Sequence, residues 1–376
     1  MIPGVRKLKS GIRSEIGLLL ILLMQLASCT SNAPHDNTTT LKLDLEGKGH
    51  RTPKVNIISC IPLETNDSSI YSFAVNIEFY KDRIYLLDPY GQKSLFTFNQ
   101  QGTFLTRTSV GHGVGEMVDP HNFFIDKEND EVIVHDQTLR KLFIYDLDLE
   151  FKRDKSINLF VEDFAIVDGN YLVLGINGDD HAHSYNLYTD NLEDPIFVFE
   201  TGFHLKDGGI GLSRPISSSK NPHLISPLNY HIYELRAGKV YPRYYLDIEK
   251  SKIISDEDQE KGLDKVFNMV MEGDKVTGPN EIAESESYIS FYLNFNPSFR
   301  YLISKPTDEV LSMNPLFEDG SLPEGRIRGY AGEGDRFYLE AKAEALIKYQ
   351  EETGNKLTDQ DLNEESNPVF VVFEII

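Results

Sequence analysis

The sequence predicts an all-β protein, a six-bladed β-propeller with four-stranded blades, and three observations lead to this prediction. A strand-rich motif recurs, so that Asp136 repeats Asp88 after 48 positions. Each copy of the motif holds four short runs of alternating apolar and polar residues, which is typical of half-buried strands. The chain also ends on an almost wholly β-branched and aromatic run, residues 369–376. Four strands in about 40 to 50 residues correspond to one propeller blade.

The repeat is clearest in the first half of the chain. Residues 83–108 align with residues 131–154, which places Lys93 on Lys141. A third copy begins near residue 163, and there Asp168-Gly169-Asn170 supplies the hairpin turn between two strands. Later alternating runs, between residues 223 and 341, are less regular but continue the pattern. Together these runs account for about six blades.

The N- and C-terminal strands are expected to close one blade. A ring of blades must hide its two open edges, because an unpaired strand edge invites unwanted pairing. Residues 55–64 and 369–376 are both rich in β-branched residues and lie at the two ends of the predicted domain. We therefore expect these two segments to pair within the closing blade.

Two short helical insertions interrupt the strands, at about residues 255–272 and 340–363. In the first, Leu263, Val266 and Val270 recur at helical spacing behind Ser255, a suitable N-cap residue. The second is expected to stop at Gly354, and a short acidic helix could follow Thr358. Their apolar stripes are expected to pack on the propeller, and a partner-binding groove is the alternative.

Residues 1–28 have the features of a lipoprotein signal peptide. The apolar run at 16–27 is 12 residues long, whereas a helix needs about 20 to cross a bilayer. Basic residues precede this run, and small residues follow it. Leu26-Ala27-Ser28-Cys29 resembles the bacterial lipobox, which implies that Cys29 becomes the acylated first residue; an ordinary secretory signal with a chance cysteine is the alternative. We expect residues 29–50 to form a flexible tether and residues 51–376 to form the propeller.

Composition limits the possible partners. Removal of the predicted leader takes four of the 37 basic and one of the 59 acidic residues, which leaves a net charge of −25. Such a chain repels nucleic acid, so none is expected as a partner. We expect contact with the membrane through the lipid anchor only. The remaining cysteine, Cys60, has no partner for a disulfide once Cys29 is acylated, and we expect a small buried apolar side chain there.

Several motifs in this order resemble the six-bladed β-propeller lipoproteins common in Bacteroidota, with NHL- or TolB-like blades. The resemblance rests on the lipobox, the blade motif with Asp88 and Asp136, the loop following the first blade, and the final strand. In that family the loop often reads Gly-x-Gly-Pro-Gly-Glu, and residues 111–116 match it except for the proline. The resemblance implies the fold and lipid anchoring, but no agreed activity.

Candidate binding residues come from two loops. The loop at 111–116 joins the outer strand of one blade to the inner strand of the next, so we expect His112 and Glu116 near the mouth of the central channel. Arg214 is expected on another loop at this mouth, as part of a mixed-charge binding set. Alternatively, the glycines of the first loop only permit the crossing between blades. Asp88 and Asp136 could form a ring of carboxylates, although Asx turns are the expected role.

The sequence predicts neither a cofactor nor a metal. His181 and His183 could ligate zinc from one strand face, but no third ligand stands at a readable spacing. The chain also has no tryptophan and no Gly-x-Ser-x-Gly nucleophile motif. Site residues are therefore predicted for binding rather than for catalysis.

These features favour a lipid-anchored cell-envelope propeller that acts as a binding or scaffolding module for a protein, peptide or glycan. The residue after Cys29 is Thr30, which favours the outer membrane. The alternative is a propeller enzyme, a glycan or peptide hydrolase or lyase with an acid–base site in the channel. A structural subunit docked through the helical insertions is a third hypothesis.

Overall fold

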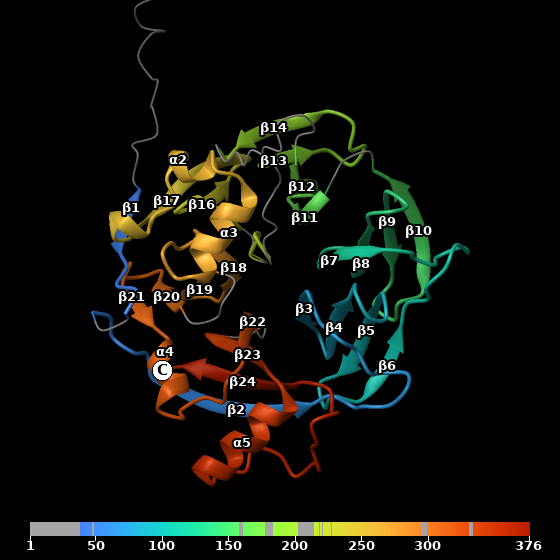
Figure 1. The fold of residues 1–376 in the computed structure, drawn as a ribbon. Helices are drawn as coiled ribbons and strands as arrows, with labels where there is room; N and C mark the ends of the chain where they lie inside the picture. Colours follow the sequence, from blue (N-terminus) through green and yellow to red (C-terminus); the bar gives the residue numbers. More distant parts are fainter. Residues whose placement is uncertain are drawn as a thin grey trace, which may run out of the picture. The chain divides into compact units, whose positions relative to one another are not determined.

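The predicted six-bladed propeller is confirmed. A computed structural model describes residues 38–46, 49–157, 161–176, 183–201, 214–217, 219, 221–226, 228–294, 299–330 and 334–376. These residues form six sheets of four strands each, arranged as blades around a central axis (Figure 1). Cys29 and His181 lie outside the described residues.

The first three blades follow the order of the chain, with the innermost strand first. Blade 1 comprises β3 (Asn76–Tyr80), β4 (Arg83–Asp88), β5 (Ser94–Asn99) and β6 (Phe104–Arg107). Blade 2 comprises β7 (Pro120–Asp126), β8 (Glu131–Asp136), β9 (Lys141–Tyr145) and β10 (Phe151–Ser156). Blade 3 comprises β11 (Val161–Val167), β12 (Asn170–Ile176), β13 (His183–Tyr188) and β14 (Pro195–Glu200).

Two of the other three blades, blades 4 and 6, include a strand from the N-terminal part of the chain. Blade 4 comprises β15 (His223–Leu224), β16 (His231–Arg236), β17 (Lys239–Asp247) and, outermost, β1 (Thr39–Lys42). Blade 5 comprises β18 (Pro279–Glu284), β19 (Tyr288–Leu293), β20 (Phe299–Ser304) and β21 (Val310–Ser312). Blade 6 comprises β22 (Arg326–Tyr330), β23 (Arg336–Ala341), β24 (Val369–Ile375) and, outermost, β2 (Val55–Pro62).

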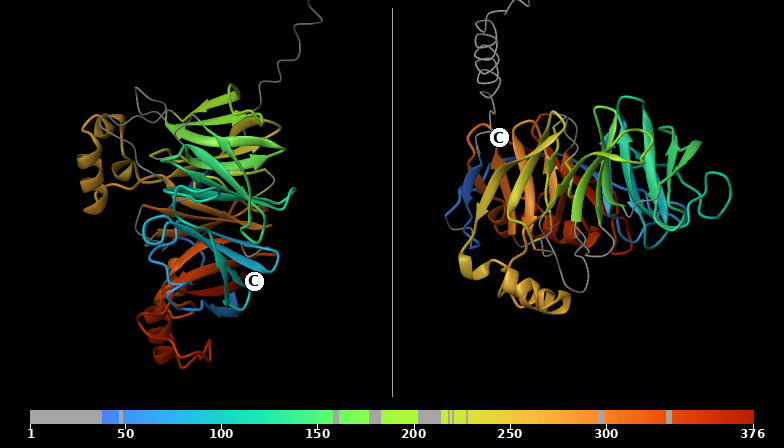
Figure 2. Two further views of the ribbon diagram at one scale, coloured as in Figure 1. Left: turned by 90° about the vertical axis from the view of Figure 1, so that its right-hand side faces the viewer. Right: turned by 90° about the horizontal axis from the view of Figure 1, so that it is seen from above.

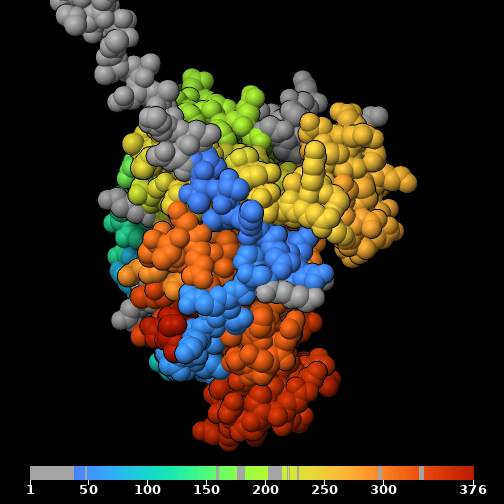
Figure 3. Space-filling model, turned by 90° about the vertical axis from the view of Figure 1, so that its left-hand side faces the viewer, coloured from blue at the N-terminus to red at the C-terminus, as the bar shows by residue number. Residues whose placement is uncertain are grey.

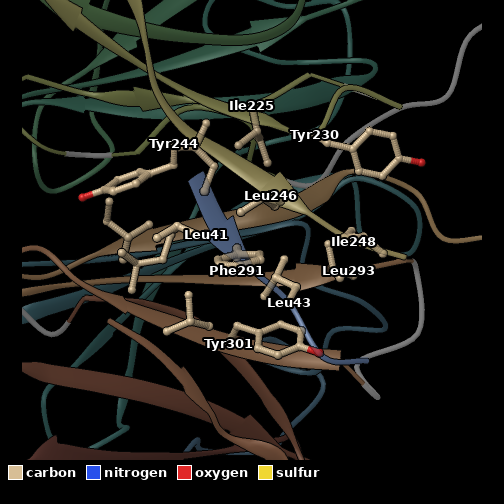
Figure 4. Packing of buried hydrophobic residues seen from close by; sticks show 14 of the residues in the cluster. Leu41, Leu43, Ile225, Tyr230, Tyr244, Leu246, Ile248, Phe291, Leu293 and Tyr301 are labelled. Carbon is tan, nitrogen blue, oxygen red and sulfur yellow. The ribbon is translucent and has the colours of Figure 1, made fainter. Parts of the chain in front are cut away.

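The core lies between the blades, because each sheet buries both of its faces against its neighbours. Alternating apolar residues of adjacent blades form one buried cluster at each junction. Between blades 4 and 5, for example, Leu246 packs with Phe291 and Tyr301 (Figure 4). The period-2 pattern of the sequence therefore sets which side chains enter these clusters.

The ring closes as predicted, through the pairing of β2 with β24. Val55 lies opposite Ile375 and Pro62 opposite Val369 in an antiparallel register. β24 also pairs with β23 on its other side. The C-terminal strand is therefore held between two neighbours, and its apolar residues are buried.

The prediction of a flexible tether at 29–50 is wrong for its described residues, because Thr39–Lys42 form the strand β1. β1 pairs with β17 in parallel, with Thr39 opposite Tyr244. Leu41 and Leu43 are 3% and 6% exposed and enter the cluster between blades 4 and 5 (Figure 4). This N-terminal segment lies on the outside of the ring (Figure 3). Burial of these two leucines offsets the entropy lost by ordering the segment.

Both predicted insertions contain helices. The first holds the 3-10 turn η1 (Lys250–Lys252), α2 (Asp256–Gln259) and α3 (Leu263–Met271), and Ser255 caps α2 as expected. The second holds α5 (Ala343–Thr353), which ends at Gly354 with φ of 71°. No helix follows Thr358 in residues 358–376, and a further helix, α4 (Asn314–Glu318), precedes β22. Within the described ranges, no helix has both the length and the apolar character to span a membrane.

The ring has two different faces. On one face, here called the helical face, α2, α3 and α5 project, whereas the C-terminus lies on the other side (Figure 2). The helical face also carries the loops at 63–75 and 109–119, since these precede the inner strands β3 and β7. The opposite face, here called the turn face, consists of tight hairpin turns such as Ala237-Gly238. β1 runs parallel to β17 and therefore toward the helical face.

Candidate functional site

The side chain of Arg214 contacts the inner strands at the centre of the ring. Its guanidinium donates to the carbonyl oxygens of Ile77 (2.9 Å) and Arg328 (2.6 Å), and it forms an ion pair with Glu78. The backbone carbonyl of Arg214 in turn accepts from Ile282 N at 3.0 Å. Arg214 lies beside blade 4, so these contacts reach the inner strands of blades 1, 5 and 6.

The position of Arg214 corrects the prediction of an exposed loop cation at the channel mouth. The residue is only 8% exposed. Burial alone lowers the pKa of Arg214, but the negative charge of Glu78 more than offsets this, and the pKa lies above its ordinary value. A buried charge needs such a partner. Arg214 therefore holds the blades together and is not available at the surface.

A second buried ion-pair network lies next to the first. The carboxylate of Glu281 contacts the guanidinium groups of Arg326 and Arg328. Arg328 also pairs with Glu340 at 2.7 Å. Burial raises the pKa of Glu281, yet the two arginines outweigh burial and hold it below its usual range. These charges neutralise one another within the structure.

The loop at 111–116 is held by its own hydrogen bonds. Glu116 Oε2 accepts from Gly113 N at 2.8 Å, and Gly111 N donates to Met117 O at 2.9 Å. Gly115 has φ of 75°, and a Cβ atom there would lie 2.7 Å from the Phe151 ring. Gly115 is thus required by the crossing between blades, which agrees with the alternative role for the glycines of this loop. His112 is exposed on this loop, and no contact between this loop and Arg214 unites the three predicted residues.

Asp88 and Asp136 bind backbone N–H groups, as the Asx-turn prediction expected. Asp88 is fully buried and accepts from Gly91 N at 2.8 Å and Gln92 N at 3.1 Å. It also accepts from Ser72 N at 2.9 Å, which ties the turn after β4 to the loop before β3. Asp136 is also fully buried and joins the corresponding loop and turn of blade 2. The carboxylate oxygens of both residues therefore accept hydrogen bonds from the backbone of the fold.

A polar hollow of about 710 Å³ opens at the rim of blade 1, next to the turn that Asp88 holds. Its lining comprises Gly91, Gln92, Lys93, Ser94, Arg107, Thr108, Ser109, Val110 and Glu116. Two cations and one carboxylate therefore face the same space. Of the three predicted residues, only Glu116 belongs to this lining. The sequence did not indicate Lys93 and Arg107, because β5 and β6 bring them together only in the folded sheet.

An exposed aromatic pair lies next to the lining of this hollow in the chain, since Tyr90 directly precedes Gly91. The centroids of Phe73 and Tyr90 are 6.2 Å apart, and the residues are 45% and 70% exposed. The guanidinium of Arg328 lies 5.7 Å from the centre of the Phe73 ring, within cation–π range. The hollow and the aromatic pair together form the candidate site, since they combine recognition groups that the fold leaves at the surface.

Three histidines and a glutamate gather between blades 2 and 3. His183 Nε2 lies 3.0 Å from Glu162 Oε2, and the rings of His121 and His135 are 6.4 Å apart. Burial, assisted by His121, lowers the pKa of His135 to about 4, so this ring is neutral at pH 7. No group of three or more His, Cys, Asp or Glu side chains in the described part of the chain could hold a metal ion.

Another polar cluster lies between blades 4 and 5, toward the turn face. Glu284 accepts from Ser217 Oγ at 2.6 Å, and it contacts His223 Nδ1 and Lys305 Nζ, each at 3.0 Å. Burial raises the pKa of Glu284, but these partners lower it to about 2. Ser217 donates to a carboxylate, whereas an activated serine donates to a histidine base. The geometry is that of a neutralised ion cluster.

The remaining cysteine, Cys60, is half-buried in β2. Burial raises the pKa of its thiol to about 12. Because the thiolate is the reactive form, this cysteine is inert at neutral pH.

Comparison with solved structures finds proteins of Bacteroides that are similar to this chain. A protein of Bacteroides fragilis NCTC 9343, described as a "Putative exported protein", matches over 90% of this chain and 99% of its own, with 16% identity and a TM-score of 0.65. A member of the duf4221 family from Bacteroides vulgatus matches over 87% of this chain and 99% of its own, with 10% identity and a TM-score of 0.48. No curated protein matches the sequence.

A family model covers almost the whole propeller. It matches residues 55–374, from the first strand of the closing blade to the last. The chain therefore belongs to the family described as "Domain of unknown function (DUF4934)".

Proposed function

We propose that this protein is an exported, lipid-anchored propeller of the cell envelope that binds a partner through its helical face. The observation that carries the proposal is the distribution of exposed apolar side chains. Twelve large apolar residues are exposed among those described. Seven of them belong to loops or α3 on the helical face: Ile70, Phe73, Tyr90, Val110, Val114, Phe267 and Met271.

The other exposed apolar residues have a different distribution. Four lie on outer strands, namely Ile58, Leu105, Ile196 and Val198, and the last is the C-terminal Ile376. None belongs to a described hairpin turn of the turn face. Exposed apolar groups that cluster on one face are typical of an interaction surface.

The direction of β1 favours the same face. The leader and Cys29 agree with a lipoprotein, and the similarity to the Bacteroides fragilis protein agrees with export. β1 runs toward the helical face, so the chain enters the propeller from the direction of the turn face. A lipid anchor upstream of β1 would then leave the helical face free to meet a partner.

Binding is preferred to catalysis because the charged groups at the centre of the ring are already paired. Arg214 contacts Glu78, Glu281 contacts two arginines, and Glu284 contacts a histidine and a lysine. Acid–base catalysis needs titratable groups free to reach a substrate. The polar groups of the rim hollow, which is open to solvent, suit recognition better.

The anchor is tested first by replacing Cys29 with serine. The wild-type protein is expected in the membrane fraction and the variant in the soluble fraction. A variant that stays in the membrane fraction, or that still incorporates a fatty-acid analogue, would contradict anchoring at Cys29.

The binding face is tested by a photo-crosslinking amino acid placed at single positions in living cells. Tyr90 and Met271 probe the helical face, and Asp168 and Ala237 serve as matched positions on the turn face. Adducts are expected from the first pair only. Equal adducts from both pairs, or adducts from the turn face alone, would overturn the proposal.

A further inference from the structure

The Phe73–Tyr90 pair is held in place by buried groups beneath it. Asp88 accepts hydrogen bonds from the backbone on both sides, at Ser72 and at Tyr90 (2.9 and 3.2 Å). Gly91 fits closely into this arrangement, since a Cβ atom there would lie 2.2 Å from Ser72 Oγ. The backbone that carries the two rings is therefore ordered before any ligand arrives, which lowers the entropy cost of binding.

Blade 2 shows that this arrangement needs no aromatic residues. Asp136 accepts from Val118 N and Leu139 N, as Asp88 accepts from Ser72 N and Gly91 N. The positions of Phe73 and Tyr90 are there occupied by Asp119 and Thr138. These two residues hydrogen-bond to each other at 3.1 Å. Blade 2 therefore forms the same arrangement with a polar pair at these positions. The fold alone does not explain why blade 1 has exposed aromatic rings there.

The adjoining hollow is cationic although the whole chain is acidic, with a net charge of −22. Lys93 and Arg107 line it, and Arg107 Nη1 donates to Gln92 Oε1 at 2.9 Å. Among the ion pairs of the described residues, none involves either cation. The guanidinium of Arg107 also lies 5.7 Å from the centre of the Phe96 ring. Neither cation is neutralised by a carboxylate in these ion pairs, so both can pair with an anionic ligand.

We propose that the hollow and the aromatic pair bind an acidic sugar, a uronate unit of a polysaccharide. The C–H face of the sugar ring lies on the electron-rich face of Tyr90. Its carboxylate meets Lys93 and Arg107, and its hydroxyl groups bond Gln92, Ser109 and Glu116. This inference rests on the proposed function, for which it names the class of ligand.

An acidic peptide is the less favoured ligand. Peptide anchors are usually aromatic or aliphatic side chains that fill apolar pockets. The only large apolar side chain in the lining of this hollow is Val110. Glu116 would also repel closely spaced carboxylates, whereas sugar hydroxyl groups can donate to it.

The test uses the mature chain with Cys29→Ser and isothermal titration against uronate oligosaccharides. The probes are oligomers of galacturonate, glucuronate-containing hyaluronan and alginate, with neutral galactose oligomers and poly-glutamate as comparisons. At least one uronate probe is expected to bind, and Tyr90→Ala is expected to weaken that binding about tenfold. Lys93→Gln with Arg107→Gln should abolish the preference for the acidic over the neutral sugar.

Thr138→Ala, at the matching position of blade 2, is the control and should bind like the parent protein. Thermal unfolding of each variant shows whether the fold is intact. Failure of every uronate to bind, binding that survives Tyr90→Ala, or binding of poly-glutamate alone would overturn the acidic-sugar assignment. These results would leave the crosslinking test of the helical face unaffected, so the two proposals can fail separately.

Discussion

The guanidinium of Arg214 and the carboxylate of Glu78 form a buried ion pair that joins opposite parts of the ring. Their side chains are 7% and 13% exposed. The partners are 136 residues apart in the sequence. The same guanidinium binds two inner-strand carbonyl oxygens. This pair therefore acts as a central cross-link between blades 1, 4 and 6.

Arg214→Met is expected to destabilise the protein by roughly 3–5 kcal/mol, because it leaves the largely buried Glu78 carboxylate without its guanidinium. Denaturant unfolding measures the change. The double variant with Glu78→Gln should recover part of the loss, since the charge of Glu78 is removed as well. A single variant within about 0.5 kcal/mol of wild type, the usual range for surface positions, would show that the pair is not structural.

Deletion of residues 369–376 is expected to cause aggregation. β24 lies between β2 and β23, so its loss separates the two ends of the ring and exposes the apolar cluster behind it. Size-exclusion chromatography and thermal unfolding measure the effect. Deletion of Ile376 alone is the control, because this residue is 70% exposed and adds one backbone hydrogen bond. Unchanged solubility of the longer deletion would contradict closure by β24.

Stability is expected to fall in acid because of His135. Its folded-state pKa of about 4 lies below the unfolded value of 6.5, so the unfolded chain takes up the proton first. The resulting loss in the free energy of unfolding is absent above pH 6.5 and grows as the pH falls toward 4. At pH 5 this loss amounts to about 2 kcal/mol.

His135→Gln should reduce this acid sensitivity, as measured by thermal unfolding at pH 8 and pH 5. The informative quantity is the change in melting temperature between pH 8 and pH 5, since the substitution also changes packing. An identical pH dependence in wild type and variant would show that His135 is not responsible.

Asp88→Ala should cost roughly 1–3 kcal/mol, because the N–H groups of Ser72, Gly91 and Gln92 lose their shared acceptor. Asp88→Asn keeps one acceptor oxygen and should cost less. Denaturant unfolding compares the two variants. Asp136→Ala is the matched change in blade 2 and should have an effect of similar size. A neutral Asp88→Ala would mean that water replaces the carboxylate.

The helical insertions show how much local pattern can predict. Ser255 and the spacing of Val266 and Val270 predicted a single helix, but the chain breaks at Gly262, with φ of 87°, and forms α2 and α3 instead. Gly354 marked the end of α5 as predicted. The acidic segment after Thr358 forms no helix. Short polar segments lack an apolar face to pack, and their intrinsic helix propensity is too weak to order them alone.

The candidate site could be predicted only in part. Glu116 was identified from its loop, but one of its oxygens binds Gly113 N. Lys93, Arg107, Phe73 and Tyr90 have no distinctive spacing in the sequence. They meet because Asp88 and the strands β5 and β6 bring separate segments together, and such contacts depend on the whole sheet.

The sequence by itself determined most of the strands, the blade repeat and the closing pair of segments, because alternation of apolar residues is a local property with a fixed period. Only the tertiary structure decided that β1 joins blade 4, that Arg214 is buried at the centre, and that the cationic hollow opens beside two aromatic rings. Each of these depends on which distant segments meet. A buried charge or a pocket is defined by those neighbours, whereas a strand is defined by its own residues.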